Sequence, residues 1–351
     1  MQSVEISIDL DRPEPDLIHA AAENTRTLQI PRPQVYWTDL LLSAIIGYAA
    51  LAVTLRINSL ALKLTAGVVA ILALYRAVSF IHELTHLKQG AVPGFRFMWN
   101  LLIGVPLLLP SFMYEGVHNL HHARSRYGTA EDPEYLPLAH MRVWTLPLFL
   151  FLSLLAPIAL LLRFAVLAPL SLVMPSLRKF VVERGSALAI SPGFRRKPPE
   201  CGDWLYWEAA TSLWAITALA LVVTGGIPLS AFVVVLIIAA GIALLNQLRT
   251  LVAHLWENDG APISITAQYL DGVNVPKGLL PELWAPVGLR YHALHHLLPG
   301  LPYHALPEAH RRLAAALPPG SAYHRANHEG LAGLTLRLFR DAQQGKTTMI
   351  D

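Results

Sequence analysis

The sequence predicts an all-α integral membrane protein with four transmembrane helices, re-entrant or interfacial helices, and a cytoplasmic cap that carries clustered histidines. Two observations predict this class. Of the 351 residues, 54% are hydrophobic and only 15% are charged, whereas soluble domains carry about 25% charged residues. The apolar runs also recur from residue 35 to residue 252 without a linker. One membrane domain is therefore expected.

Changes in polarity divide the chain into three parts. Residues 1–34 are polar and rich in proline, which predicts a cytoplasmic N-terminal tail. Residues 35–302 form the predicted membrane domain, and residues 303–351 a cytoplasmic C-terminal segment. The N-terminus is acidic and lacks the basic and apolar regions of a signal peptide. Insertion is therefore expected to begin at the first internal span.

Four apolar segments approach the length of about 20 residues that a bilayer requires. Lys88 and Arg96 follow the second segment closely, and basic residues favour the cytoplasmic side of a membrane. Four crossings then bring the ends of the second and fourth segments to the same cytoplasmic face. The four predicted spans are Val35 to Leu55, Ala61 to about Phe80, Trp204 to Val223, and Ile227 to about Leu248.

Two further apolar segments do not fit a simple crossing. Residues 101–113 are too few to cross and contain two prolines, which favours a re-entrant or interfacial segment. Residues 143–174 are long enough, but one crossing would place the basic loop that follows them outside. A broken hairpin or an in-plane pair of helices avoids this conflict, with Arg163 expected to extend its charge toward the interface.

Composition excludes several kinds of site. Cys201 is the only cysteine, so the chain cannot form an internal disulfide, a multi-thiolate zinc site or an iron–sulfur cluster on its own cysteines. The net charge of +3 does not indicate a nucleic-acid surface, because the Lys and Arg residues lie beside apolar runs. They are interpreted as topology signals.

Histidines gather in three short clusters. Residues three and four apart lie on one face of a helix, so the imidazoles of each cluster are expected to point toward one locus. Eight or nine imidazoles exceed what one tetrahedral ion can use, which predicts two metal ions. The predicted ligands are His82 and His86, then His118, His121 and His122, then His292, His295 and His296, with His254 after the last span as a ninth candidate.

One competing interpretation uses the first cluster alone. His82-Glu83-Leu84-Thr85-His86 also fits the HExxH pattern of zinc proteases, in which the glutamate is the general base. Leu270-Asp271-Gly272 is similar to the aspartate motif of intramembrane proteases of the site-two type. This alternative leaves both HxxHH clusters without a role, whereas a two-metal site uses all three clusters.

With these residues in view, the chain resembles the membrane fatty acid desaturase superfamily, which includes related hydroxylases and carotenoid ketolases. The resemblance extends over residues 75–315 and includes the segments 246–254 and 286–304 around the last two groups of histidines. It implies a di-iron centre at the cytoplasmic membrane face, above a tunnel for an acyl chain, with the nine histidines as ligands. Thr250 departs from relatives that place a water-bridging Asn at this position.

The resemblance also implies the activity. Zinc has no redox chemistry, whereas a di-iron centre with O₂ as co-substrate can attack an unactivated methylene. The predicted enzyme is an O₂-dependent acyl desaturase, with no catalytic residue beyond the metal centre. A hydroxylase or ketolase on the same centre is the alternative. The sequence His82-Glu-Leu-Thr-His86-Leu-Lys88 is also similar to membrane alkane hydroxylases, whose other histidine motifs are not matched.

Partners and outer residues complete the expectations. The substrate is a lipid or an acyl thioester, and the electron donor is a separate ferredoxin, rubredoxin or cytochrome. The expected location is a bacterial inner membrane. Ligand imidazoles usually donate their second N–H to an outer acceptor. Arg249 is expected to extend toward the interface, and binding of an acyl carrier's phosphate or carbonyl is the alternative for this residue. The candidate acceptors are Glu83, Glu115, Asp132, Glu257 and Asp271.

Overall fold

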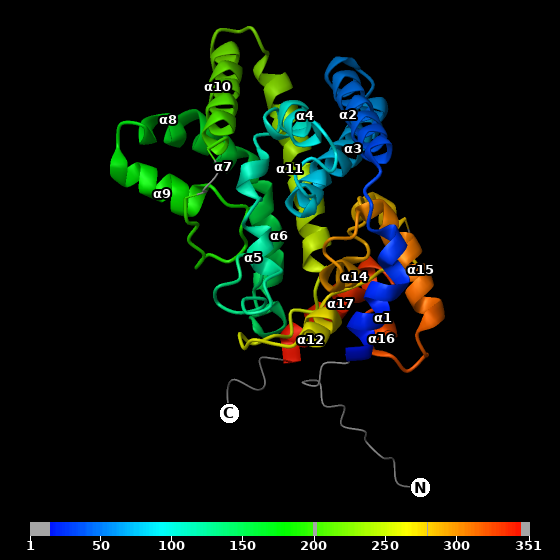
Figure 1. The fold of residues 1–351 in the computed structure, drawn as a ribbon. Coiled ribbons are helices and arrows are strands. Elements are labelled where there is room, and N and C mark those ends of the chain that lie inside the picture. Colours follow the sequence, from blue (N-terminus) through cyan, green and yellow to red (C-terminus); the bar gives the residue numbers. More distant parts are fainter. Residues whose placement is uncertain (1–14, 199–201, 279, 345–351) are drawn as a thin grey trace.

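The computed structural model describes residues 15–198, 202–278 and 280–344, and within these ranges the chain is helical, with isolated β-bridges but no strand. Four of its helices are long and apolar enough to cross a membrane (Figure 1). They confirm the four predicted spans. These helices are α2 (Pro33–Arg56), α3 (Leu60–His86), α10 (Trp204–Val223) and α11 (Leu229–Leu251).

Helix α3 is the central span, and two glycines let its neighbours approach it closely. A Cβ on Gly47 of α2 would lie 2.7 Å from the side chain of Leu74. A Cβ on Gly241 of α11 would lie 2.5 Å from Ile71. A Cβ at either position would force the side chain of Leu74 or Ile71 to move, so glycine permits this close approach. This close packing holds the middle of α3 against both neighbours.

The segment after α3 turns back instead of crossing, as predicted. It contains α4 (Phe95–Trp99), a π-helical turn (Asn100–Gly104) and a 3₁₀ turn (Ser111–Met113). The Asn100 side chain donates to the Ser111 hydroxyl at 2.9 Å and accepts from the Ser111 backbone N–H at 2.8 Å. The indole N–H of Trp99 donates to the carbonyl of Ala77 in α3. These bonds hold the turn against the central span.

Residues 145–171 form a pair of helices that are bent by about 50° relative to each other. The first is α6 (Thr145–Leu154), and the second consists of α7 (Ala156–Leu162), a π-helical turn (Arg163–Leu167) and α8 (Ala168–Ser171). The expectation that Arg163 extends toward the interface is wrong. Its side chain is buried, and it bonds Glu208 of α10 at 2.5 Å. Glu208 lies 45 residues later in the sequence, so this buried partner for the Arg163 charge could not be read from the local sequence.

The remaining helices surround the inner ends of the spans. Figure 1 shows most of them at the end of the molecule opposite the turn between α10 and α11. Residues 1–14 of the predicted tail and 345–351 of the predicted C-terminal segment lie outside the described residues, and the three-part division stays a prediction. The helices are α1 (Pro15–Thr25), α5 (His118–His121), α9 (Pro175–Gly185), α12 (Ile265–Asp271), α13 (Pro281–Trp284), α14 (His292–Leu297), α15 (Leu306–Ala316), α16 (Ala322–Arg325) and α17 (Leu331–Gln344).

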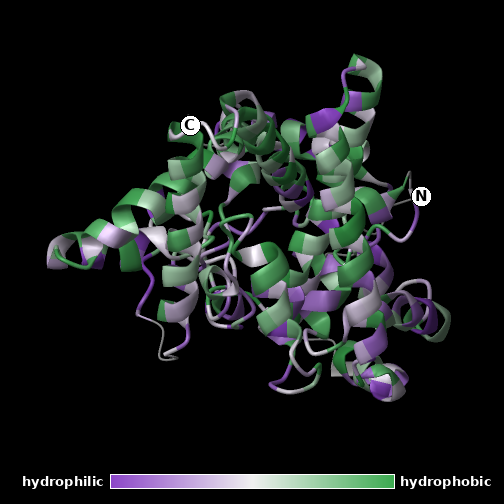
Figure 2. Cartoon of the chain, turned by 90° about the horizontal axis from the view of Figure 1, so that it is seen from above, coloured by the Kyte–Doolittle hydropathy of each residue, from purple (hydrophilic) through white to green (hydrophobic). Residues whose placement is uncertain are grey.

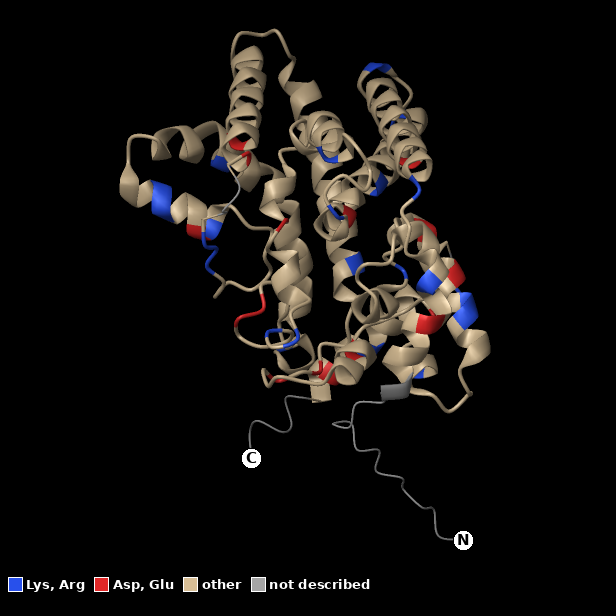
Figure 3. Ribbon diagram, in the orientation of Figure 1, with Lys and Arg blue, Asp and Glu red and all other residues tan. Residues whose placement is uncertain are grey.

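Polarity separates the two ends of the molecule. The view from above shows hydrophobic residues over much of the spanning helices (Figure 2). Charged residues are sparse where α10 meets α11 and concentrate nearer the end that holds α12, α15 and α17 (Figure 3). This distribution is typical of helices embedded in lipid beneath a polar cap. The histidine clusters lie where the spans meet that cap.

Candidate metal centre

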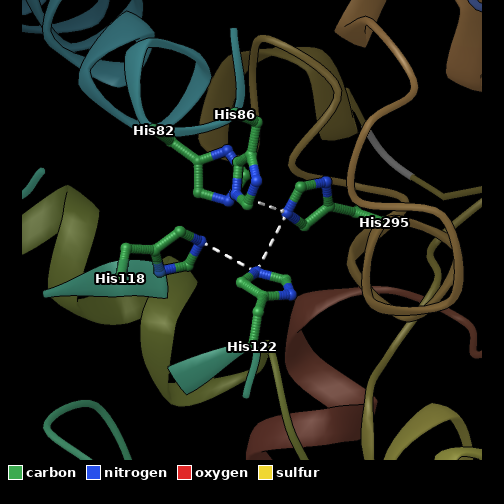
Figure 4. Close-up of side chains that lie close together, drawn as sticks. All are labelled: His82, His86, His118, His122 and His295. Carbon is green, nitrogen blue, oxygen red and sulfur yellow. Dashed lines mark hydrogen bonds between the residues drawn. The ribbon is translucent and has the colours of Figure 1, made fainter. Parts of the chain in front are cut away.

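The structure brings all nine predicted histidines together, in two separate groups. Within each group, one ligand atom from every histidine lies within 4.8 Å of the others. The five-histidine group has ligands from α3, α5 and α14 (Figure 4), and the four-histidine group uses α5, α14 and the loop that follows α11. The first group is His82, His86, His118, His122 and His295, and the second is His121, His254, His292 and His296.

Each HxxHH cluster is divided between the two groups, which corrects the expectation of one locus for each cluster. In the α5 cluster, His118 and His122 join the five-histidine group, whereas His121 joins the four-histidine group. Helix α14 makes the reverse division, and only His295 joins the five-histidine group. Consecutive residues differ by about 100° around a helix. Adjacent histidines therefore point into different groups, and two short helices can bridge both groups.

Nitrogen spacings within the groups match metal coordination. The Nε2 atoms of His118 and His122 lie 2.9 Å apart, and that of His295 lies 3.1 Å from those of both His86 and His122 (Figure 4). In the other group, the Nε2 atom of His292 lies 3.0 Å from that of His254. Two nitrogens bound at right angles to one ion, each at about 2.1 Å, would lie about 3 Å apart.

Hydrogen bonds alone cannot satisfy this packing. A neutral imidazole has one N–H, yet Nε2 of His295 faces two other ring nitrogens. Both ring nitrogens of His82 are buried without a partner. Burial and the neighbouring imidazoles lower the pKa of His122, His295 and His296, which favours the neutral form that binds metals. The residues therefore fit two metal ions.

The loop after α5 supplies an outer acceptor for each group. Nδ1 of His121 lies 2.9 Å from the fully buried carboxylate of Asp132, as predicted. Nδ1 of His118 lies 2.9 Å from Glu134, a partner that was not predicted from the sequence. The signal was its position two residues after Asp132 in the same loop. The backbone N–H of Glu134 donates to Asp132 at 2.8 Å, so one loop conformation places both carboxylates.

A tyrosine connects His254 to its acidic partner. The Tyr127 hydroxyl donates to Asp271 at 2.6 Å and lies 2.8 Å from Nδ1 of His254. Asp271 was predicted as an outer acceptor, and its carboxylate lies 3.6 Å from the same ring nitrogen. The Tyr135 hydroxyl also donates to Asp271. Neither tyrosine was predicted, because each lies more than a hundred residues from its partner in the sequence.

The other three predicted acceptors contact no histidine of either group. Tyr36 donates to the Glu83 carboxylate at 2.6 Å, and the backbone N–H of Tyr303 donates to it at 3.2 Å. Glu115 pairs with Arg96, and Glu257 with Arg337. Because Glu83 is occupied in this way, it is not placed as the general base that the zinc-protease alternative requires.

A cavity of about 310 Å³ reaches the edge of the five-histidine group. His86, Glu83 and Lys88 line one side of it, and the loop of residues 297–302 lines the other. Thr25 and Gln29 of the N-terminal segment also line it. A small molecule in this cavity would lie beside one histidine of the five-histidine group.

Comparisons with known proteins agree with this geometry. A family model described as fatty acid desaturase matches residues 59–327. A protein of Caulobacter vibrioides (strain NA1000 / CB15N) named ceramide hydroxylase is 47% identical over 333 residues, which cover 93% of this chain and 94% of the relative. No solved structure gives a significant match. The chain therefore belongs to the fatty acid desaturase family, whose members are histidine-box, di-iron oxidoreductases.

Proposed function

We propose that this protein is an O₂-dependent lipid hydroxylase that acts on ceramide or a closely related N-acyl lipid. One observation carries the proposal: the relative named ceramide hydroxylase is 47% identical and aligns over almost the full length of both chains. The sequence alone put desaturation first and hydroxylation second. The relative favours the second, since the two reactions share one metal scaffold and diverge only after the first hydrogen is removed.

The nine histidines are proposed to hold two iron ions, one in each group. When bound, a reduced iron pair supplies the O₂ reduction that attack on an unactivated C–H bond requires. The protein's residues hold and orient this pair. Asp132, Glu134 and Tyr127 fix the tautomers of three imidazoles. The burial of most of the nine histidines limits the access of water to the centre.

The proposed reaction needs an external reductant to balance. One C–H bond and one O₂ molecule, with two electrons and two protons, give one C–OH bond and one water molecule. We assign the electrons to a separate ferredoxin, rubredoxin or cytochrome. Lys179, Arg184, Arg195 and Lys197 form a basic region on α9 and the loop after it, which suits an acidic partner. Reduction that does not slow at high ionic strength would argue against this docking region.

The proposed location is a bacterial inner membrane, with the metal centre at the cytoplasmic face. Support comes from Lys88 and Arg96, which follow the second span, and from the concentration of charge toward the cap (Figure 3). Labelling of single cysteines in intact cells tests it, each introduced into a protein in which Cys201 is replaced by serine. A residue in the turn between α10 and α11 should react with an impermeant reagent from outside, and a residue in α15 should not.

The decisive experiment supplies the purified, iron-loaded protein with ceramide, O₂ and a reduced donor. Mass spectrometry should detect a product that has gained one oxygen atom. A product that has lost two hydrogen atoms instead would establish desaturation and overturn the proposal. His295→Ala is the inactive control, because it removes a proposed ligand. Metal analysis runs beside the assay, and one zinc ion without iron would exclude a di-iron enzyme.

A further inference from the structure

Arg249 is a buried cation without a partner beside the metal centre. It lies in the last turn of α11, and its residue is 8% exposed. Its Nε and Nη2 atoms are enclosed and have no hydrogen-bond partner, and no carboxylate among the described residues pairs with it. The expectation that Arg249 extends toward the interface is therefore wrong. An unpaired buried charge destabilises the folded protein, so its retention needs a reason.

The position of Arg249 suggests that reason. It follows Ile238 and Ile242 on the buried face of α11, and these two residues belong to the apolar core between the spans. Arg249 also precedes His254 of the four-histidine group by five residues. The charge of Arg249 is close enough to act on the imidazoles of His82, His292 and His295. Arg249 thus lies near both the apolar core of the spans and the histidines.

Two of the nine histidines present unpartnered nitrogens in the same region. Nδ1 of His292 and both ring nitrogens of His82 are buried without a hydrogen-bond partner. Their rings lie 6.5 Å apart. When each ring gives one nitrogen to a metal ion, the other becomes an N–H donor. In contrast, His118, His121 and His254 have outer partners from the loop after α5 and from α12.

We propose that Arg249, with His82 and His292 beside it, forms a subsite for a polar oxygen of the lipid substrate. The inference rests on the proposed function, since a ceramide-class lipid carries such oxygens, in its amide and hydroxyl groups, close to otherwise apolar chains. An oxygen acceptor held by the guanidinium would satisfy buried donors that no protein group satisfies. It would also fix which carbon of the lipid reaches the metal centre.

The test measures equilibrium binding of a radiolabelled short-chain ceramide to the full-length, iron-loaded protein in detergent, without an electron donor, so that no turnover occurs. Arg249→Gln should weaken binding by about 10- to 100-fold, the usual effect of losing a charge-assisted hydrogen bond. Arg249→Lys, which keeps the charge, should recover part of the loss. Arg312→Gln is the matched control, because Arg312 pairs with Glu308 on the cap, and it should bind as the wild type does.

Analogues identify the oxygen. The 1-deoxy and 3-deoxy ceramides each lack one hydroxyl. An analogue that lacks the oxygen bound by Arg249 should have a low affinity for the wild type. The Arg249→Gln substitution should then lower that affinity only a little further. If both analogues remain sensitive to the substitution, the amide oxygen is the partner. Arg249→Gln that keeps its iron and binds ceramide within about twofold of the wild type overturns the subsite.

Other outcomes separate the subsite from the proposed function and from a structural role. No ceramide binding to the wild type would refute the proposed substrate class instead. If Arg249→Gln loses iron or thermal stability, Arg249→Lys is used in its place. An Arg249→Lys protein that is less stable than the wild type but binds ceramide with unchanged affinity contradicts the subsite. Formate is tested as a free anion. If formate protects the wild type but not Arg249→Gln against heat, and both proteins bind ceramide with the same affinity, the site binds a free anion and not a lipid oxygen.

Discussion

The five-histidine group and the four-histidine group differ in how many imidazoles they offer and in how those imidazoles are supported. In the larger group, one of five ring systems has an acidic outer partner, which is Glu134 on His118. In the smaller group, two of four have one, through Asp132 and through Asp271 with Tyr127. The smaller group thus offers fewer imidazoles, but a larger share of them has an acidic partner.

From this difference we infer unlike tasks for the two groups. A site with fewer protein ligands keeps a position open for an exogenous molecule, as catalytic metal sites do. Acidic outer partners raise the basicity of the imidazoles and hold their orientation. We therefore expect the four-histidine group to depend more on its outer residues, and the five-histidine group to depend more on the number of its ligands.

The largest effect is expected from removing one ligand of either group. His295→Ala and His121→Ala should each lower activity by more than about 100-fold, because even outer partners are worth about 10- to 100-fold. Iron content should fall in both variants, as measured by elemental analysis of purified protein. His310→Ala is the control, because His310 belongs to neither group and its Nδ1 atom lies 2.8 Å from the Tyr323 hydroxyl. Equal tolerance at all three positions would contradict the ligand assignment.

The outer carboxylates test the contrast directly. Asp132→Asn should reduce iron affinity or activity by about 10- to 100-fold, because Asp132 is fully buried and also accepts from the backbone N–H of Gly128. Glu134→Gln should have a smaller effect, since its side chain is 16% exposed and four other imidazoles remain in its group. The reverse order, measured by competition with an iron chelator, would remove the proposed difference between the groups.

Tyr127→Phe should act more weakly. It deletes one hydroxyl that joins Nδ1 of His254 to Asp271, and a neutral hydrogen bond is worth about 1 kcal/mol. Iron affinity should therefore fall by about 3- to 10-fold. Tyr135→Phe is the matched comparison, because its hydroxyl contacts Asp271 without contacting the imidazole. A larger loss in Tyr135→Phe than in Tyr127→Phe would place the important contact on Asp271 alone.

The smallest effect is expected at the cap surface. Arg337→Ala removes an ion pair with Glu257, in which the two side chains are 43% and 51% exposed. Exposed pairs contribute about 0–1 kcal/mol, so activity and iron content should match the wild type. The change tests whether Glu257 matters to the centre, as its place among the predicted acceptors implied. A clear loss of iron in Arg337→Ala would return Glu257 to the site.

Sequence reasoning was most successful where local periodicity determines structure. Apolar length predicted α2, α3, α10 and α11, and the spacing of the histidines selected the nine residues that converge. Their division into two groups was missed, because it depends on how α5 and α14 are rotated against each other. Spacing along one helix indicates which residues share a face, but not what that face meets.

Buried charges were the main source of wrong expectations. Arg163 and Arg249 were both expected to reach toward the interface, which is the usual behaviour of a basic residue near a helix end. Arg163 instead meets Glu208, 45 residues later in the chain, and Arg249 is enclosed near the histidines. Glu134 was missed for a related reason, since the loop after α5 has no periodicity that would indicate which side chains turn inward.

The division of the α5 and α14 clusters between the two groups has a consequence for metal loading. Each short helix contributes at least one imidazole to both groups, so an ion that fixes these helices in one group also orders ligands of the other. The second ion then meets a smaller entropic cost, and the two affinities are linked. Iron uptake by the apoprotein should be cooperative, with little half-loaded protein at the midpoint of a titration.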